Sequence, residues 1–135
     1  MRVAAPKEER IVFDRLSLDD GLSQSIVEEM VQDRTGFMWF ATQGGLNRYD
    51  GYTFKIYAHD PDDPNSLSEN TIYALNRDTQ GHIWIGTARG GLSIFDPLTE
   101  QFTNYPPNPD DPDAISNGSV HVIYQADDGT AWLGT

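Results

Sequence analysis

Three tryptophans have the residue type and the spacing that could do chemistry in this chain. Trp39, Trp84 and Trp132 follow one another at intervals of 45 and 48 residues. A flat aromatic face can stack on a sugar ring, so these side chains could form a carbohydrate platform. Each one, however, occupies the same place in a repeated segment. A large apolar residue that recurs in every repeat is expected to pack between neighbouring units, so we predict that the three indoles are structural.

Two acidic segments, residues 59–66 and 109–116, carry enough carboxylate oxygens to suggest a calcium site. Their spacing lacks the central glycine and the terminal glutamate of an EF-hand loop. Proline mixed with aspartate and asparagine is instead typical of turns. We therefore predict no metal site and no cofactor.

The three histidines, His59, His82 and His121, fall at unmatched positions in the repeat. No two of them have the spacing of metal ligands. The sequence contains no cysteine, which excludes thiolate ligands and a cysteine nucleophile. A catalytic centre needs a base, a nucleophile and an orienting group within reach of one another, and no such set is recognisable. We predict that the chain is not an enzyme.

The charge balance excludes further classes of partner. The chain has 21 acidic and 9 basic residues, a formal net charge of -12. Such a chain lacks the clustered cations that bind nucleic acid without regard to sequence or that attach to anionic membranes. No run approaches the ~20 apolar residues that span a bilayer. Residues 1–10 lack the apolar core of a secretory signal and resemble what remains after its removal, although Met1 could equally come from an expression vector or from the start of a gene fragment.

The elements that must position these side chains come in repeats. Residues 33–51 reappear at 78–97, and their front half appears again at 127–135. Gly36, Gly81 and Gly129 keep the same two intervals as the tryptophans. Internal periods of this length indicate stacked supersecondary units.

Each unit divides into four short strands separated by Asp- and Gly-rich turns. The first turns are expected at Asp33 to Gly36, Asp78 to Gly81 and Asp127 to Gly129. First strands are expected at 27–32, 72–77 and 120–125, second strands at 37–42, 82–87 and 130–135, and third strands at 46–50 and 92–96. Fourth strands carry the pairs Phe54/Tyr57 and Phe102/Tyr105. Only residues 21–33 have a helical pattern, and their alignment with the other units favours a strand. Four antiparallel strands in ~45 residues, with a Gly and Trp signature, are typical of a β-propeller blade.

The repeat predicts an all-β chain that forms an incomplete propeller ring. Its expected parts are a disordered leader at 1–10, a lone outer, ring-closing strand at 11–20, a first blade at 21–66, a second at 67–114, and the first two strands of a truncated third at 115–135. Propellers close with about four to eight blades. We therefore expect these residues to be a fragment of a longer protein.

The segments HIWIGTARGGLSIFD (82–96) and GFMWFATQGGLNRYDGY (36–52) resemble the two-component regulator propeller repeat. Ala41 stands where that repeat usually has glycine, and the tripeptide SLS at 66–68 is also typical of it. The resemblance covers roughly residues 11–135 and implies the extracytoplasmic sensor of a hybrid histidine kinase, on the periplasmic or extracellular side. Many members of the family are linked to polysaccharide sensing, and others carry a diguanylate cyclase as output.

The resemblance implies an oligosaccharide or another small ligand, contact with the remaining blades, and a homodimer in the parent protein. In a propeller the loops after the second strand and before the first strand lie on one face. Four variable polar residues in those loops are the candidate ligand-binding set: Gln43, Asn70, Arg89 and Asn117. Rigid strands that present variable loops are suited to binding, although the same residues could simply be solvated. Two other functions stay open, a protein-interaction scaffold and a propeller lyase or glycosidase, which would need carboxylate, His or Tyr groups at the ring centre.

Overall fold

The computed structural model describes residues 2–3, 13–14, 19, 21–23 and 26–135. Within them the strands are β1 (Arg2–Val3), β2 (Phe13–Asp14), β3 (Val27–Gln32), β4 (Met38–Thr42), β5 (Gly45–Tyr49), β6 (Phe54–Tyr57), β7 (Ile72–Arg77), β8 (Ile83–Thr87), β9 (Leu92–Asp96), β10 (Gln101–Tyr105), β11 (Val122–Gln125) and β12 (Ala131–Gly134). No helix in the described part of the chain is long and apolar enough to cross a membrane.

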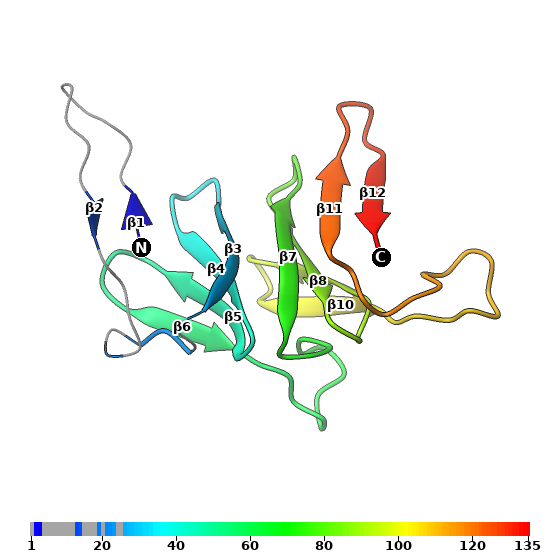
Figure 1. Ribbon diagram of the computed structural model, residues 1–135. Helices are drawn as coiled ribbons and strands as arrows, with labels where there is room; N and C mark the ends of the chain where they lie inside the picture. Colours follow the sequence, from blue (N-terminus) through cyan, green and yellow to red (C-terminus); the bar gives the residue numbers. More distant parts are fainter. Residues whose placement is uncertain (1, 4–12, 15–18, 20, 24–25) are drawn as a thin grey trace.

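The strands form the blades that the repeat predicts. β3 to β6 make one four-stranded sheet, β7 to β10 make a second, and β11 pairs with β12. Within each of these sheets, strands that follow one another in the sequence pair antiparallel. Figure 1 shows the first strands β3, β7 and β11 side by side, with the sheets fanning out as an open arc. The expected all-β fold of propeller blades in an incomplete ring is confirmed.

The expected leader at 1–10 and lone outer strand at 11–20 stay predictions. In the described residues Arg2–Val3 pairs antiparallel with Phe13–Asp14 in a sheet of its own. The rest of 1–10 and 11–20, apart from Asp19, lies outside the described residues. The four-stranded sheets fall inside 21–66 and 67–114, and we keep those blade limits as a proposal.

The first turn of each complete unit is organised by an aspartate. The Asp33 carboxylate accepts the backbone N–H groups of Thr35, Gly36 and Phe37 and the indole N–H of Trp39. Gly36 closes this turn at a φ of 99°, which an L side chain rarely adopts. Asp78 has the same role in the second unit.

The third unit differs from the expected turn at Asp127 to Gly129. Its turn begins one residue earlier, because Ala126 donates its N–H to Thr130 and accepts the N–H of Gly129. Ala126 therefore occupies the place of Asp33 and Asp78. The third turn has no equivalent carboxylate.

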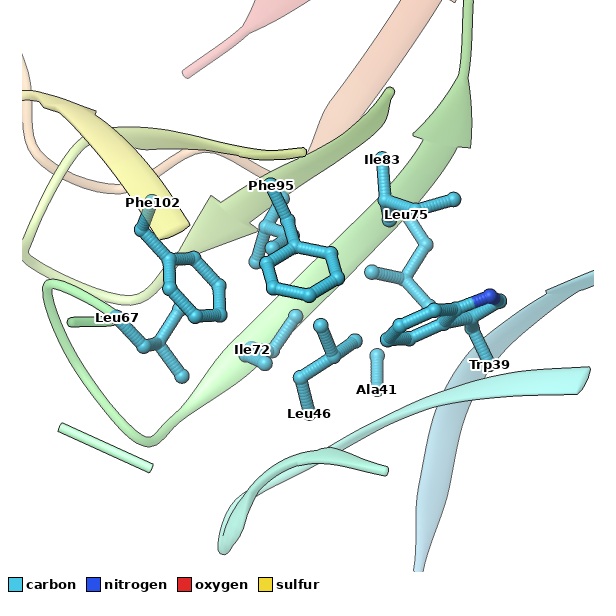
Figure 2. Packing of buried hydrophobic residues seen from close by; sticks show 10 residues of the cluster. Trp39, Ala41, Leu46, Leu67, Ile72, Leu75, Ile83, Phe95 and Phe102 are labelled. Carbon is cyan, nitrogen blue, oxygen red and sulfur yellow. The ribbon is translucent and has the colours of Figure 1, made fainter. Parts of the chain in front are cut away.

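The main hydrophobic core lies between the first two sheets, as Figure 2 shows. It consists of Trp39, Ala41 and Leu46 from the first sheet and Leu67, Ile72, Leu75, Ile83, Ile85, Phe95 and Phe102 from the second unit. The ring centroids of Trp39 and Phe95 are 5.2 Å apart. A smaller core follows between the second sheet and the third unit, around Ala74, Leu92, Val120 and Ile123. Each sheet thus buries its apolar side chains against the next one.

The three tryptophans are buried to different degrees. Trp39 is fully buried, Trp84 is half-buried, and Trp132 is 65% exposed. The exposure of Trp132 differs from the core position that the repeat predicts. The four-stranded second sheet covers Trp39, whereas only the two strands of the third unit cover Trp84. No sheet in the described residues packs beyond Trp132, so burial falls along the chain.

Candidate functional site

The four candidate loop residues occupy corresponding turns of the sheets. Gln43 lies between β4 and β5, and Arg89 lies between β8 and β9. Asn70 and Asn117 lie in the segments that lead into β7 and β11. All four are exposed.

Backbone contacts bring three of these positions to one edge. Ala88 donates its N–H to the carbonyl of Thr71 at 3.0 Å, which places Asn70 beside the Arg89 turn. Gly91 donates to the carbonyl of Gly118 at 2.9 Å, which places Asn117 on the other side of that turn. Gly118 approaches Arg89 so closely that a Cβ there would clash with the Arg89 carbonyl.

Gln43 occupies the equivalent turn of the first sheet. Within the described residues no hydrogen bond or ion pair joins it to the other three. The candidate set is therefore one cluster of three residues and a separate fourth.

Two of the candidate side chains already serve their own loops. The Oδ1 atom of Asn70 accepts the N–H of His59 at 2.6 Å. The Oδ1 atom of Asn117 accepts the N–H of Ser119 at 2.9 Å, an Asx turn. Their amide NH₂ groups remain available to a ligand.

Glu69 is the residue of this face that the sequence analysis missed. Its Oε2 accepts the backbone N–H groups of Arg89 at 2.5 Å and Gly90 at 3.1 Å, and its Oε1 lies 3.3 Å from Arg89 Nη2. The Glu69 side chain is only 16% exposed, whereas that of Arg89 is 88% exposed. Glu69 therefore fixes the backbone of the turn between β8 and β9, while the Arg89 guanidinium that it pairs with stays exposed to solvent. A charged residue directly after the SLS tripeptide at 66–68 was the available signal.

Buried hydroxyl and amide groups support the same face. Ser23 Oγ lies 2.9 Å from Thr42 Oγ1, and Asn47 donates to Ser23 Oγ at 2.8 Å. In the second unit Ser68 Oγ lies 2.9 Å from Ser93 Oγ. Thr42, Asn47 and Ser93 are fully buried. Because buried polar groups need partners, these bonds fix each loop to its own third strand and keep the loop bases rigid.

The opposite edge of the sheets carries an aspartate–histidine group. His82 Nδ1 lies 3.2 Å from Asp78 Oδ2, and His82 Nε2 lies 3.9 Å from Asp96 Oδ2. Burial alone would raise the pKa of Asp78, but hydrogen bonds from the Trp84 indole and from backbone N–H groups lower it below its usual value. Among the described residues, no group of three His, Asp or Glu side chains could hold a metal ion.

A polar contact on the outer side links the first two sheets. Glu100 accepts hydrogen bonds from Lys55 Nζ at 2.7 Å and from the Tyr57 hydroxyl at 2.6 Å. These bonds lower the pKa of Glu100, and the bond to Glu100 raises the pKa of Lys55. Burial raises the pKa of Tyr57, and Glu100 adds to the effect. The contact is an inter-sheet brace, because Glu100, between β9 and β10, accepts hydrogen bonds from two side chains of β6.

An apolar groove of about 660 Å³ lies between the second sheet and the third unit. Its walls include Trp84, Leu92, Ile94, Tyr105, Ile115 and Leu133. At the preceding interface the corresponding space beside Trp39 and Tyr57 is filled by Phe95 and Phe102. The groove is thus a packing surface of the repeat rather than a ligand pocket.

Comparison with known proteins agrees with this geometry. Residues 66–89 match the family described as two component regulator propeller. These residues run from the SLS tripeptide to Arg89, and the resemblance seen in the sequence is confirmed.

Two solved structures from B. thetaiotaomicron share the fold. One is described as the "extracellular domain of the putative hybrid two component system BT3049"; it is 33% identical, with a TM-score of 0.82 over 90% of this chain and 17% of that one. The other, the "extracellular domain of the putative one component system BT4673", is 25% identical, with a TM-score of 0.68 over 83% of this chain and 16% of that one.

A curated relative is the "Histidine kinase P4" of Formosa agariphila, which is 49% identical over 57 residues. That match spans 42% of this chain and 4% of the relative. The chain thus spans about one sixth of the solved domains and a small part of this kinase.

Proposed function

We propose that this chain is part of an extracytoplasmic ligand-sensing β-propeller in a two-component regulator of the hybrid sensor histidine kinase type. One observation carries the proposal: nearly the whole chain superposes on the extracellular domain of a hybrid two-component system at 33% identity. The proposed location is periplasmic or extracellular. The proposed partners are the remaining blades of the parent protein and a second copy of it.

The chain acts by binding rather than by catalysis in this proposal. Its rigid strands and buried hydroxyl pairs hold the loop turns, and the loops differ from unit to unit. A ligand that binds one sensor conformation better than another shifts the population toward it. That shift is the signal passed to the output domain.

The proposed ligand is an oligosaccharide bound partly by the loop face, which is the face formed by the loops before the first strand and after the second strand of each unit. Arg89 and the amide groups of Asn70 and Asn117 offer donors to sugar hydroxyls, and Gln43 adds another in the first unit. The net charge of -12 works against a sulfated or uronate-rich glycan.

The direct test measures thermal shifts of the purified chain with a panel of neutral and anionic oligosaccharides. A ligand at one hundred times its Kd stabilises the native state by about 2.7 kcal/mol, a readily measured shift. Autophosphorylation of the parent protein in membrane vesicles should respond to the same sugar. Absence of a thermal shift with every sugar, together with an unresponsive kinase, would remove the carbohydrate assignment.

A protein-interaction scaffold is the second candidate. The exposed side chains of Val122, Tyr124 and Trp132 favour it, since clustered apolar surface marks interfaces. A scaffold would bind a protein partner and leave the thermal-shift panel without effect. A sensor with a diguanylate cyclase output would show the same thermal shifts with the oligosaccharides and would differ only in the product of its output domain.

A further inference from the structure

A β-bulge recurs at the same position in the first strand of both complete sheets. The pairing of β3 with β4 shifts register between Val27 and Glu29, which leaves Glu28 as the extra residue. The pairing of β7 with β8 shifts in the same way between Ile72 and Ala74, which leaves Tyr73. Bulges re-aim a side chain and occur often next to binding sites.

The third unit has His121 at the corresponding position. Its Val120 N–H bonds to the Thr87 carbonyl of the preceding sheet, and the His121 N–H bonds to Gly134 just before the β11–β12 ladder begins. Val120 and Ile72 are both fully buried, so the two segments align. The three equivalent positions therefore carry Glu28, Tyr73 and His121.

These side chains come from strands that lie next to one another. β3 and β11 both contact β7, and Figure 1 shows the three strands side by side on the inner side of the arc. In a propeller, the blades surround a central channel. The three equivalent positions thus place chemically different groups along one channel wall. The residues on both sides of Tyr73 and His121 are apolar, whereas Glu28 is followed by Glu29, which accepts the N–H of Leu75.

The Tyr73 and His121 rings form a stacked pair, with centroids 4.8 Å apart and an interplanar angle of 11°. Tyr73 is half-buried, and His121 and Glu28 are exposed. Within the described residues, the Tyr73 hydroxyl, the His121 ring nitrogens and the Glu28 carboxylate make no hydrogen bond. A flat aromatic surface therefore stands beside unused donors and acceptors, including a carboxylate that accepts only.

We propose that Glu28, Tyr73 and His121 form a second sugar-binding surface on the channel wall, distinct from the loop face. The ligand is a neutral oligosaccharide: a pyranose ring packs on the exposed part of the Tyr73–His121 stack, and its hydroxyls bond to the phenol, the imidazole and the carboxylate. Each sugar hydroxyl both donates and accepts, which suits this mixed set. The net charge of -12 and Glu28 itself disfavour anionic glycans. The inference rests on the proposed function, since it names a site for the same class of ligand.

The test uses isotope-labelled chain and four neutral hexasaccharides, built from glucose, xylose, mannose or galactose. Binding of at least one should shift the aromatic NMR signals of Tyr73 and His121. Tyr73→Ala should weaken the affinity for that sugar about tenfold. Tyr52→Ala is the matched control, because Tyr52 is 91% exposed and lies in a turn of the first sheet; it should leave the affinity unchanged.

Two conservative variants separate binding from folding. Tyr73→Phe and His121→Phe keep an aromatic pair but remove its polar atoms, so each should fold normally and still lose several-fold in affinity. If the stack is only a brace between sheets, both variants bind the sugar as tightly as the parent chain, and the inference is wrong.

The outcomes also distinguish this inference from the proposed function. A sugar that shifts signals of Arg89 and Asn117 but not those of Tyr73 and His121 overturns the channel-wall site and leaves a carbohydrate sensor. Binding of a sulfated hexasaccharide in preference to the neutral ones overturns the ligand class. No binding of any neutral sugar overturns the channel-wall site, whereas the carbohydrate sensor is overturned only if the anionic sugars and the parent kinase also give no response.

Discussion

The indole Nε1 of Trp39 donates a 2.8 Å hydrogen bond to the carboxylate of Asp33, which also organises the preceding turn. Trp84 and Asp78 repeat this relationship at 3.0 Å. The aspartate therefore joins two functions in both complete units, because one oxygen closes the hairpin and the other orients the tryptophan that packs between sheets. Turn and core are coupled through a single side chain.

Removal of the Asp33 carboxylate should destabilise the chain strongly. Asp33 is 8% exposed and accepts hydrogen bonds from three backbone N–H groups and an indole. Asp33→Ala leaves several of these donors unpaired, so we expect a loss of about 2–4 kcal/mol in the free energy of unfolding. Urea denaturation followed by tryptophan fluorescence measures it. Asp62→Ala, in an exposed turn, is the control and should change stability by less than about 0.5 kcal/mol.

The third turn offers the converse experiment. Ala126 occupies the place of Asp33 and Asp78, and the Trp132 indole makes no hydrogen bond within the described residues. Ala126→Asp should supply the missing acceptor and stabilise β11–β12 by about 1 kcal/mol. Hydrogen exchange of the β11 amides would show the gain. The gain should shrink when Trp132→Phe is added, and an equal gain in both backgrounds would contradict the pairing.

Acid should loosen the contact between the first two sheets. Hydrogen bonds from Lys55 and Tyr57 hold the pKa of Glu100 below its usual value. A group with a lowered folded-state pKa stabilises the fold above its unfolded pKa, and that stability is lost as pH falls through the folded-state value. Asp78 has a lowered pKa and acts in the same direction.

Carboxyl groups protonate at about pH 4 and below. We therefore expect the urea concentration at the unfolding midpoint to decrease in this pH range. Glu100→Gln should lower the midpoint at neutral pH and flatten this part of the profile. If the urea midpoint of Glu100→Gln decreases at acid pH as much as that of the parent chain, the pH dependence comes from other carboxylates.

Gly86 should not tolerate a side chain. A Cβ at this position would lie 2.5 Å from the Val120 carbonyl oxygen and 2.8 Å from Val120 Cγ1. Gly86→Ala forces the third unit away from the second sheet, and we expect a cost of about 1–3 kcal/mol. Ala41 occupies the equivalent position in the first sheet and is fully buried. Ala41→Gly is thus the matched control, with a cost of about 1 kcal/mol from the lost methyl and added backbone freedom.

The sequence predicted the strands well because their signals are local. The predicted strands at 27–32, 72–77 and 92–96 match β3, β7 and β9 residue for residue. Turn aspartates and glycines mark their ends, and those residues act within a few positions of one another. The error in the third turn has the same origin, since two adjacent aspartates concealed that the turn starts at Ala126.

The contacts between units could not be predicted in this way. Glu100 bonds to Lys55 and Tyr57 across more than forty residues, and Tyr73 stacks on His121 across a similar separation. Such pairs depend on how two sheets are rotated against each other and on where a bulge shifts the register. A single sequence contains no direct signal for the rotation between two sheets or for the position of a bulge. The bulge residues were not predicted either, because Glu28, Tyr73 and His121 differ from unit to unit and form no repeated motif.

The placement of Phe95 and Phe102 over Trp39 has a consequence for the order of folding. The first sheet is covered by aromatic side chains that are encoded about sixty residues downstream of its own tryptophan. At a synthesis rate of about 5–20 residues per second, a completed sheet waits several seconds for its cover. Nascent sheets therefore expose an apolar face while they wait. Folding of such an array proceeds as a moving front, in which each newly synthesised sheet protects the one before it.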